Sequence, residues 1–265
     1  MIATLHQVKL GFDDHGDGLP VVFLHGFPHD RTLWMHQRMA LSSRVRCIVP
    51  DLRGFGESSS HGPYSMATYA DDVVALLDWL EIDDAVVCGL SMGGYVAMAM
   101  WRQHADRIRG LVLCDTRATA DADAARATRN ELIQLARAEG ASAVAARQMP
   151  GMVGKFTRAT RPTVLSTMEA MMSRQPVAGI VGALEALRDR PDSRETLASI
   201  TVPTLVIVGE DDVVTPERDA LAMMELLPLA AKAQLARIPN AGHVSCLERP
   251  SAVNLVLAEF LAASF

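Results

Sequence analysis

The sequence predicts an α/β fold in which a mostly parallel β-sheet is covered by helices on both faces. Short apolar runs bounded by turn residues recur along the chain, and their hydrophobicity is continuous, as in strands buried on both faces of a sheet. These runs span residues 21–24, 45–49, 85–88, 111–114, 205–208 and 233–238. Apolar residues at helical spacing follow over 69–80 and over 253–261. Alternation of strand and helix is typical of crossover units, which build a sheet covered on both sides.

Size and composition allow a large core and argue against several kinds of partner. The chain has 265 residues, of which 49% are hydrophobic. Its 31 acidic and 25 basic residues are mixed, without a Lys/Arg block that would follow phosphates, so we expect no nucleic-acid partner. No stretch approaches the roughly 18 apolar residues of a membrane span, and the N-terminus lacks the pattern of a signal peptide. We therefore expect a soluble, cytoplasmic protein with no membrane partner, either monomeric or a homo-oligomer.

The four cysteines, Cys47, Cys88, Cys114 and Cys246, lie far apart in the sequence. Neither a CxxC redox pair nor a zinc knuckle can be drawn from them, so the sequence predicts no metal site. The first three lie in apolar runs that we expect to be strands. We interpret them as reduced thiols in the core.

The segment from residue 116 to residue 199 interrupts the alternation of strand and helix. It has no convincing strand, is rich in Ala, Arg and Met, and has helix-like stretches at 130–138, 164–172 and 180–187. The strand pattern resumes at Pro203. We predict one core domain formed by residues 1–115 and 200–265, with residues 116–199 inserted as a helical cap.

The segment Gly89-Leu90-Ser91-Met92-Gly93 has the G-x-S-x-G form of a nucleophile elbow. It follows an apolar run and leads into a helical stretch over 95–102, which is the context that an elbow needs. A serine on so sharp a turn needs neighbours without a Cβ, so other side chains would collide at Gly89 and Gly93. The Ser91 hydroxyl would then stand clear at the carboxyl edge of the sheet as the nucleophile.

A serine hydroxyl is a weak nucleophile at neutral pH, so it needs a general base, and the base needs an orienting acid. His243 lies in a loop between the last expected strand and the C-terminal helix, from which it could reach the elbow. We predict that it is the base. Other histidines have polar or helical surroundings and no partner motif, and we expect them at the surface: His6, His15, His36, His61 and His104.

The acid is expected in the turn at residues 209–212, because this turn follows a strand at the same edge of the sheet as the elbow. We predict Asp212, and two alternatives stay open: the adjacent Asp211, and Asp115 at the end of another strand. The following Thr215-Pro216 is expected to start a helix, with the threonine as its N-cap. The order Ser, Asp, His along the chain is the one expected for an elbow-bearing fold.

Two backbone amides are expected to stabilise negative charge on a substrate carbonyl. The Met92 N–H points from a helix N-terminus towards charge formed at the elbow. The second donor should come from the loop after an early strand, and Phe27 is our candidate. Removing one such donor typically costs about 3 to 4 kcal/mol of transition-state stabilisation.

Together these motifs resemble the α/β-hydrolase superfamily over most of the chain. The resemblance implies an eight-stranded, mostly parallel sheet flanked by helices, with a helical cap between the sixth and seventh strands. It also implies Ser91 as nucleophile, Asp212 as acid and His243 as base, with Phe27 and Met92 as the oxyanion-hole donors. The matching segments are His25-Gly26-Phe27-Pro28, Asp51-Leu52-Arg53-Gly54-Phe55-Gly56-Glu57-Ser58, Gly89-Leu90-Ser91-Met92-Gly93-Gly94, Gly209-Glu210-Asp211-Asp212 and Gly242-His243. We interpret the second of them as a structural turn.

Within the superfamily, Ser91 argues against haloalkane dehalogenases and epoxide hydrolases, which use a carboxylate nucleophile. The segments at 62–65, 88–94 and 111–116 resemble carboxylesterases and 3-oxoadipate enol-lactonases, whereas Pro28 is similar to the loop of cofactor-free haloperoxidases, esterases that also make peracids. The resemblance implies a cofactor-independent carboxylic ester hydrolase with a Ser-His-Asp acyl-enzyme mechanism. A lactonase and a perhydrolase side activity are the alternatives, and the substrate is a small ester or lactone.

Other functional classes stay open, because the same fold also serves as a ligand receptor, and acyltransferases and carbon–carbon bond hydrolases use the same residue types. Arg158 and Arg161 are candidates either for binding a substrate carboxylate or for solvated surface positions. The cap methionines are candidates either for an apolar acyl pocket or for the cap's own core: Met149, Met152, Met168, Met171 and Met172.

Overall fold

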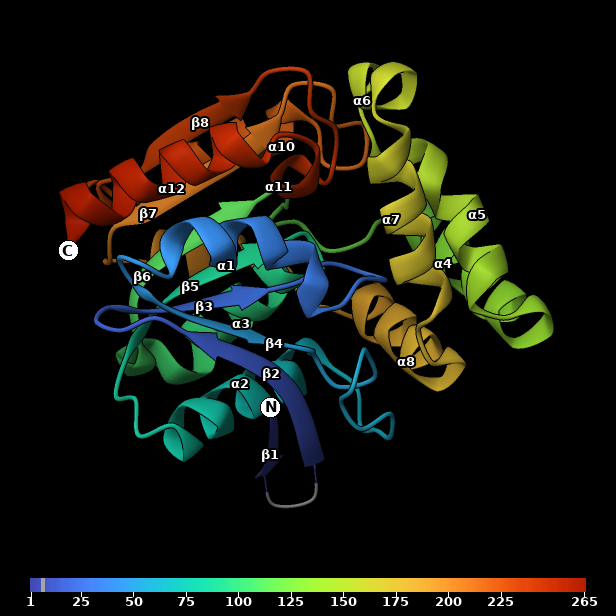
Figure 1. The fold of residues 1–265 in the computed structure, drawn as a ribbon, viewed down its shortest axis with the longest axis horizontal. Helices are drawn as coiled ribbons and strands as arrows, with labels where there is room; N and C mark the ends of the chain where they lie inside the picture. The colour runs from blue at the N-terminus through green and yellow to red at the C-terminus, as the bar shows by residue number, and fades with distance from the viewer. Residues whose placement is uncertain (6–7) are drawn as a thin grey trace.

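The computed structural model describes residues 1–5 and 8–265, and its centre is an eight-stranded β-sheet with the strand order β1-β2-β4-β3-β5-β6-β7-β8 (Figure 1). From β4 to β8 in this order all neighbours run parallel, whereas β2 runs antiparallel to both β1 and β4. The strands are β1 (Ile2–Leu5), β2 (Val8–His15), β3 (Pro20–Leu24), β4 (Arg46–Pro50), β5 (Ala85–Leu90), β6 (Ile108–Cys114), β7 (Thr204–Gly209) and β8 (Gln234–Ile238). The predicted eight-stranded, mostly parallel sheet is confirmed.

The central strands are buried on both faces, which explains why their hydrophobicity is continuous. Every residue of β5 and β7 is buried. In β3, Val22 and Leu24 pack into one hydrophobic cluster, while Val21 and Phe23 pack into a second cluster across the sheet. Burial alternates along β1, and β2 ends in polar residues, so a search for continuous apolar runs misses both strands.

Helices cover both faces of the sheet, as predicted. The first cluster includes side chains of α2 (Met66–Trp79), α3 (Met92–His104) and α10 (Glu217–Leu226). The second includes side chains of α1 (Met35–Leu41), α11 (Ser245–Glu248) and α12 (Pro250–Ser264). Short 3-10 helices span Arg31–Trp34, Ala105–Arg107 and Leu229–Ala231. Within the described residues, no helix is long and apolar enough to cross a membrane.

A group of helices lies between β6 and β7 and is called here the helical insertion. Figure 1 shows α4 to α8 gathered together at one side of the sheet. The helices are α4 (Asp123–Glu139), α5 (Ala141–Met152), α6 (Lys155–Thr160), α7 (Pro162–Ser173), α8 (Val177–Arg188) and α9 (Arg194–Ala198). The three helix-like stretches expected from the sequence lie in α4, α7 and α8. The apolar pattern does not predict α5, which contains Pro150, or the short α6 and α9.

The helical insertion contacts the core through two glycines, Gly179 and Gly54. A Cβ at Gly179 of α8 would lie 1.8 Å from the carbonyl oxygen of Gly54, so the two backbones are in direct contact. Gly54 has a φ of 92°, which favours glycine in its own right. Asp51 braces the turn by accepting hydrogen bonds from the Arg31 and Glu57 amides at 2.7 and 2.9 Å. The turn at 51–58 therefore has the structural role that its sequence suggests.

Candidate active site

Ser91 lies on a sharp turn between the end of β5 and the start of α3. Its φ of 53° and ψ of −109° are a strained conformation for a residue with a side chain. A Cβ at Gly89 would lie 2.2 Å from the Gly93 carbonyl oxygen, and a Cβ at Gly93 would lie 2.2 Å from the Leu24 carbonyl oxygen. The elbow therefore has the close backbone approach that its two glycines predict.

Three residues predicted to act together lie in one chain of hydrogen bonds. His243 Nε2 is 2.9 Å from Ser91 Oγ, and His243 Nδ1 is 2.9 Å from Asp212 Oδ2. Asp212 and His243 are buried, whereas Ser91 is half-buried and lines a cavity. This arrangement can pass a proton from the serine hydroxyl to the imidazole while the carboxylate holds the ring.

The carboxylate of Asp212 is fixed by the residues that follow it. Its Oδ1 accepts hydrogen bonds from the Val214 and Thr215 amides at 2.8 and 3.0 Å, and its Oδ2 accepts the Thr215 hydroxyl at 2.7 Å. The predicted N-cap role of Thr215 is wrong. The helix α10 begins two residues later, at Glu217 with Pro216 in the cap position, because the threonine hydroxyl is used by the acid.

The two other candidate acids, Asp115 and Asp211, form hydrogen bonds away from the imidazole. Asp115 is fully buried, its Oδ1 accepts the Gly209 amide at 2.8 Å, and its Oδ2 accepts the Ser245 hydroxyl at 2.5 Å. It thus ties the end of β7 to the loop that carries the histidine. Burial, followed by the nearby charge of Asp212, raises the pKa of Asp115 to about 8. Asp211 accepts the Lys155 amide at 3.3 Å and does not reach the imidazole.

The charges around the imidazole favour its protonation. Burial alone would lower the pKa of His243, but the charge and the hydrogen bond of Asp212 outweigh it, so this pKa is raised above 6.5. For Asp212, burial acts to raise the pKa, and the imidazole and Thr215 overcome it, so its pKa is lowered. The pair is therefore suited to hold an ion pair when the imidazole takes up a proton.

The loop that carries His243 is held by the helical insertion. The His243 amide donates to the Met152 carbonyl oxygen at 2.9 Å. The buried carboxylate of Glu248 accepts the Gly242 amide at 2.7 Å and the Gly154 amide at 2.8 Å, so it joins the histidine loop to the insertion. Nothing in the local sequence around Glu248 predicts this link, because its second partner lies 94 residues away.

Two backbone amides are available next to Ser91. Neither the Phe27 amide nor the Met92 amide has a hydrogen-bond acceptor among the described residues. Phe27 lines the same cavity as Ser91. The preceding His25 is structural: its Nε2 accepts the Leu52 amide at 2.9 Å, and its Nδ1 lies 2.9 Å from the Gly26 carbonyl oxygen. Both amides are therefore available to donate to a bound group, and their role as an oxyanion hole stays a prediction.

The cavity at Ser91 and His243 has a volume of about 90 Å³, with both apolar and charged walls. Arg117 and Arg129 lie in its wall. Arg158 and Arg161, the arginines proposed from the sequence, donate instead to the backbone carbonyls of Val153 and Glu248. Among the five cap methionines, Met152 both lines the cavity and packs into a core cluster. The other four pack into the same cluster, Met168, Met171 and Met172 fully and Met149 in part.

Most histidines named from the sequence are at least partly exposed, but one buried histidine was missed. His15 and His61 are exposed, and His36 and His104 are half-buried; His6 lies outside the described residues. His29 is fully buried, and neither of its ring nitrogens has a hydrogen-bond partner among the residues that the structure describes. Burial, together with the charges of two neighbouring histidines, lowers its pKa to about 3. Its sequence context gives no sign of this burial.

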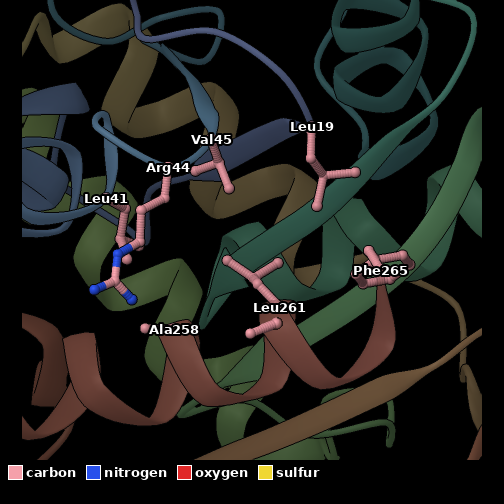
Figure 2. Close-up of a pocket in the computed structure, with 8 residues that line it drawn as sticks. Leu19, Leu41, Arg44, Val45, Ala258, Leu261 and Phe265 are labelled. Atoms are coloured by element: carbon pink, nitrogen blue, oxygen red, sulfur yellow. The ribbon is translucent and has the colours of Figure 1, made fainter.

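Neither the cysteines nor an apolar pocket at the C-terminal helix adds catalytic groups to the site. All four cysteines are buried free thiols. Within residues 1–5 and 8–265, no group of three or more His, Cys, Asp or Glu side chains is placed to hold a metal ion. Figure 2 shows an apolar pocket lined by Leu41, Leu261 and Phe265, with Arg44 as its charged side chain. Its volume is about 270 Å³. Leu19 and Val45 in its wall directly precede β3 and β4, so the pocket lies where strands begin, whereas Ser91 follows the end of β5.

Comparison with known proteins places the chain in a family. A family model described as alpha/beta hydrolase fold matches residues 20–250. The chain is similar to a thermophilic esterase from Thermogutta terrifontis, with 39% identity and a TM-score of 0.94 over 99% of this chain and 96% of that chain. It is also similar to an enol-lactonase from Burkholderia xenovorans, with 29% identity and a TM-score of 0.91 over 99% and 100% of the two chains. A bromoperoxidase from Bacillus anthracis matches with 25% identity and a TM-score of 0.88 over 99% of each chain. The chain therefore belongs to the α/β-hydrolase-fold family, in the group that contains esterases, enol-lactonases and haloperoxidase-like proteins.

Proposed function

We propose that this hydrolase cleaves carboxylic esters through an acyl-enzyme on Ser91, with His243 as general base and Asp212 as the orienting acid. The observation that carries the proposal is the unbroken set of hydrogen bonds from Asp212 through His243 to Ser91, with 2.9 Å at both imidazole nitrogens. The proposal is further supported by the amides of Phe27 and Met92, neither of which has a hydrogen-bond acceptor among the described residues, and by Phe27 lining the same cavity as Ser91.

In the proposed mechanism, His243 Nε2 takes the Ser91 proton as the serine oxygen attacks the ester carbonyl carbon. Negative charge on the carbonyl oxygen is stabilised by the amides of Phe27 and Met92. The imidazolium then protonates the leaving alcohol, and an acyl-serine remains. A water molecule, deprotonated by the same imidazole, releases the carboxylic acid and restores the serine.

The first test compares hydrolysis of p-nitrophenyl acetate and butyrate by the wild type and by Ser91→Ala. We expect the variant to lose about a thousandfold or more in kcat, as removal of a triad member does elsewhere. Circular dichroism of both proteins controls for folding. A folded wild type that hydrolyses neither ester, or a variant that retains its rate, would contradict the proposal.

A second candidate is the hydrolysis of a lactone or ester that carries a carboxylate, and the charges of the cavity wall favour it. Arg129 and Arg190 share one aspartate, Asp121, at 3.1 and 2.6 Å. The terminal nitrogens of Arg129 have no hydrogen-bond partner among the described residues. The esterase from Thermogutta terrifontis was studied with malate bound, and malate is a dicarboxylate. An anionic substrate group could therefore complete the pairing of Arg129.

This candidate is tested by comparing monoethyl adipate with diethyl adipate. Arg129→Gln should lower kcat/KM for the anionic ester about tenfold relative to the neutral one, because a charged hydrogen bond is lost. Arg137→Gln on the same helix is the control, since Arg137 pairs with Glu185 on an exposed surface. An unchanged ratio in Arg129→Gln would show that Arg129 does not bind the carboxylate, and would contradict this candidate.

A further inference from the structure

A second cavity adjoins the one at Ser91 and is much larger. Its volume is about 470 Å³, against about 90 Å³ for the catalytic cavity. Volumes of roughly 300 to 1,000 Å³ are typical of small-molecule sites, so the smaller cavity alone is short of room for most substrates. The larger cavity lies between α4 and α5. Its apolar lining includes Leu132, Leu135 and Val214, and its charged side chains are Glu131 and Arg147.

Two residues line both cavities and so place them side by side. Gln148 belongs to α5, and Val214 belongs to the turn after Asp212. The Val214 amide donates to Asp212 at 2.8 Å, and its carbonyl oxygen accepts a hydrogen bond from Arg117. Because both its amide and its carbonyl oxygen are hydrogen-bonded, the backbone of Val214 has a fixed position. Val214 therefore forms a fixed boundary between the catalytic cavity and the larger cavity, which is called here the groove between α4 and α5.

The position of Val214 decides which half of an ester faces the groove. In acyl transfer, the imidazole must protonate the leaving alcohol, so the alcohol lies on the histidine side of the scissile bond. Val214 is two residues from the acid that holds this imidazole, and it belongs to the same turn. The groove thus adjoins the turn that holds the imidazole, and this is the side on which the leaving alcohol is placed in the inference below.

We infer that the groove between α4 and α5 binds the alcohol part of the substrate, and that the preferred esters carry an extended apolar alcohol. The inference deepens, and rests on, the proposed ester hydrolysis at Ser91. Its chemical basis is the apolar floor made by Leu132, Leu135 and Val214. The small cavity at the serine would then hold a short acyl group.

Gly151 offers a way to close the groove without disturbing the backbone. It lies in the helix α5, and a Cβ there would have only Val214 Cγ2 within 4 Å, at 3.8 Å. A side chain at this position would enter the groove next to Val214. Gly151→Trp is therefore the blocking variant, and Gly151→Leu is a smaller second choice. The control is Ala146→Trp, which puts the same side chain on the exposed side of α5.

The substrates are hexyl acetate and ethyl hexanoate, which are isomers that carry the long chain on the alcohol side and on the acyl side. For the wild type, kcat/KM should be higher for hexyl acetate than for its isomer. Gly151→Trp should lower the ratio of the two values about tenfold or more, as expected when an apolar pocket loses several methylene contacts. Ala146→Trp should keep the wild-type ratio.

Ethyl acetate distinguishes a failure of the groove assignment from a failure of the proposed ester hydrolysis. If the wild type hydrolyses ethyl acetate but prefers ethyl hexanoate, or if Gly151→Trp and Gly151→Leu both fold and leave the ratio unchanged, the groove is not the alcohol site and only this inference is overturned. If the folded wild type hydrolyses none of the esters, the proposed function fails, and the inference fails with it.

Discussion

The hydroxyl of Thr215 donates a 2.7 Å hydrogen bond to Oδ2 of Asp212, the oxygen that also faces the imidazole. The same hydroxyl lies 3.2 Å from His243 Nδ1, so it sits in the corner between acid and base. The amides of Val214 and Thr215 donate to the other carboxylate oxygen, Oδ1. Together with the hydroxyl, these bonds hold the carboxylate in a single orientation. This residue was expected to cap a helix, and its position in the site gives it a different use.

Thr215→Val keeps the shape of the side chain but removes the hydroxyl donor. We expect kcat/KM for p-nitrophenyl acetate to fall about tenfold, because a hydrogen bond to a charged group typically contributes about 1.5 to 3 kcal/mol. Thr215→Ser, which restores the hydroxyl, should recover most of the activity. A Thr215→Val enzyme with wild-type kinetics would show that the amides alone are sufficient to hold Asp212.

Asp212→Asn should reduce kcat by about four orders of magnitude, since an amide at this position favours the wrong imidazole tautomer. Asp211→Asn is the control at the neighbouring position, because among the described residues that carboxylate accepts a hydrogen bond only from the Lys155 amide. It should remain close to wild type in the same assay. A larger loss in Asp211→Asn than in Asp212→Asn would reverse the assignment of the acid.

The pH dependence of kcat/KM should report the imidazole of the free enzyme. A protonated His243 cannot take the proton of Ser91, so activity should fall as pH decreases through the pKa of His243. Because that pKa is raised above 6.5, half of the maximal kcat/KM should be reached above pH 6.5. Initial rates from about pH 5 to about pH 9 would give this value. A midpoint below 6.5 would contradict the dominance of the Asp212 charge.

Asp115→Asn should change how stability depends on pH. The pKa of Asp115 is raised from 3.8 to about 8 in the folded protein, so its contribution to stability is present below pH 3.8 and is lost as pH rises through about 8. An asparagine does not titrate, yet it can accept from Gly209 and donate to Ser245. The variant should gain stability relative to the wild type between about pH 5 and about pH 8.5 in urea unfolding. An equal difference at both pH values would mean that Asp115 is ionised throughout.

The parts of the fold that depend on local pattern could be predicted from the sequence. Continuous apolar runs gave the buried strands, since those strands have no polar face, and the glycines of the elbow followed from sterics at Ser91. β1 could not be found in this way because its burial alternates over only four residues. The division of the insertion into separate helices also escaped, since Pro150 lies inside α5 rather than at its boundary.

In the candidate site, the positions of single residues at strand ends were predictable, whereas contacts between distant segments were not. Ser91, Asp212 and His243 could be chosen because each follows a strand in a recognisable order. The link from Glu248 to Gly154 spans 94 residues and depends on how the insertion packs. For the same reason the sequence did not single out Arg117 and Arg129, which lie in the cavity wall, whereas Arg158 and Arg161 had been candidates either for the cavity or for the surface.

His29→Leu should stabilise the protein. The wild-type ring is fully buried, and neither nitrogen has a partner among the described residues, so folding removes both from water without replacement. Such a group costs about 1 to 3 kcal/mol, and a leucine of similar size would remove that cost. Urea unfolding at neutral pH should show a higher midpoint, whereas His36→Leu, at a half-buried position, should change little. A lower midpoint in His29→Leu would mean that the imidazole has a hydrogen-bond partner, such as a buried water. A higher midpoint with lower esterase activity would instead mean that the ring is kept for its position beside His243 at the expense of stability.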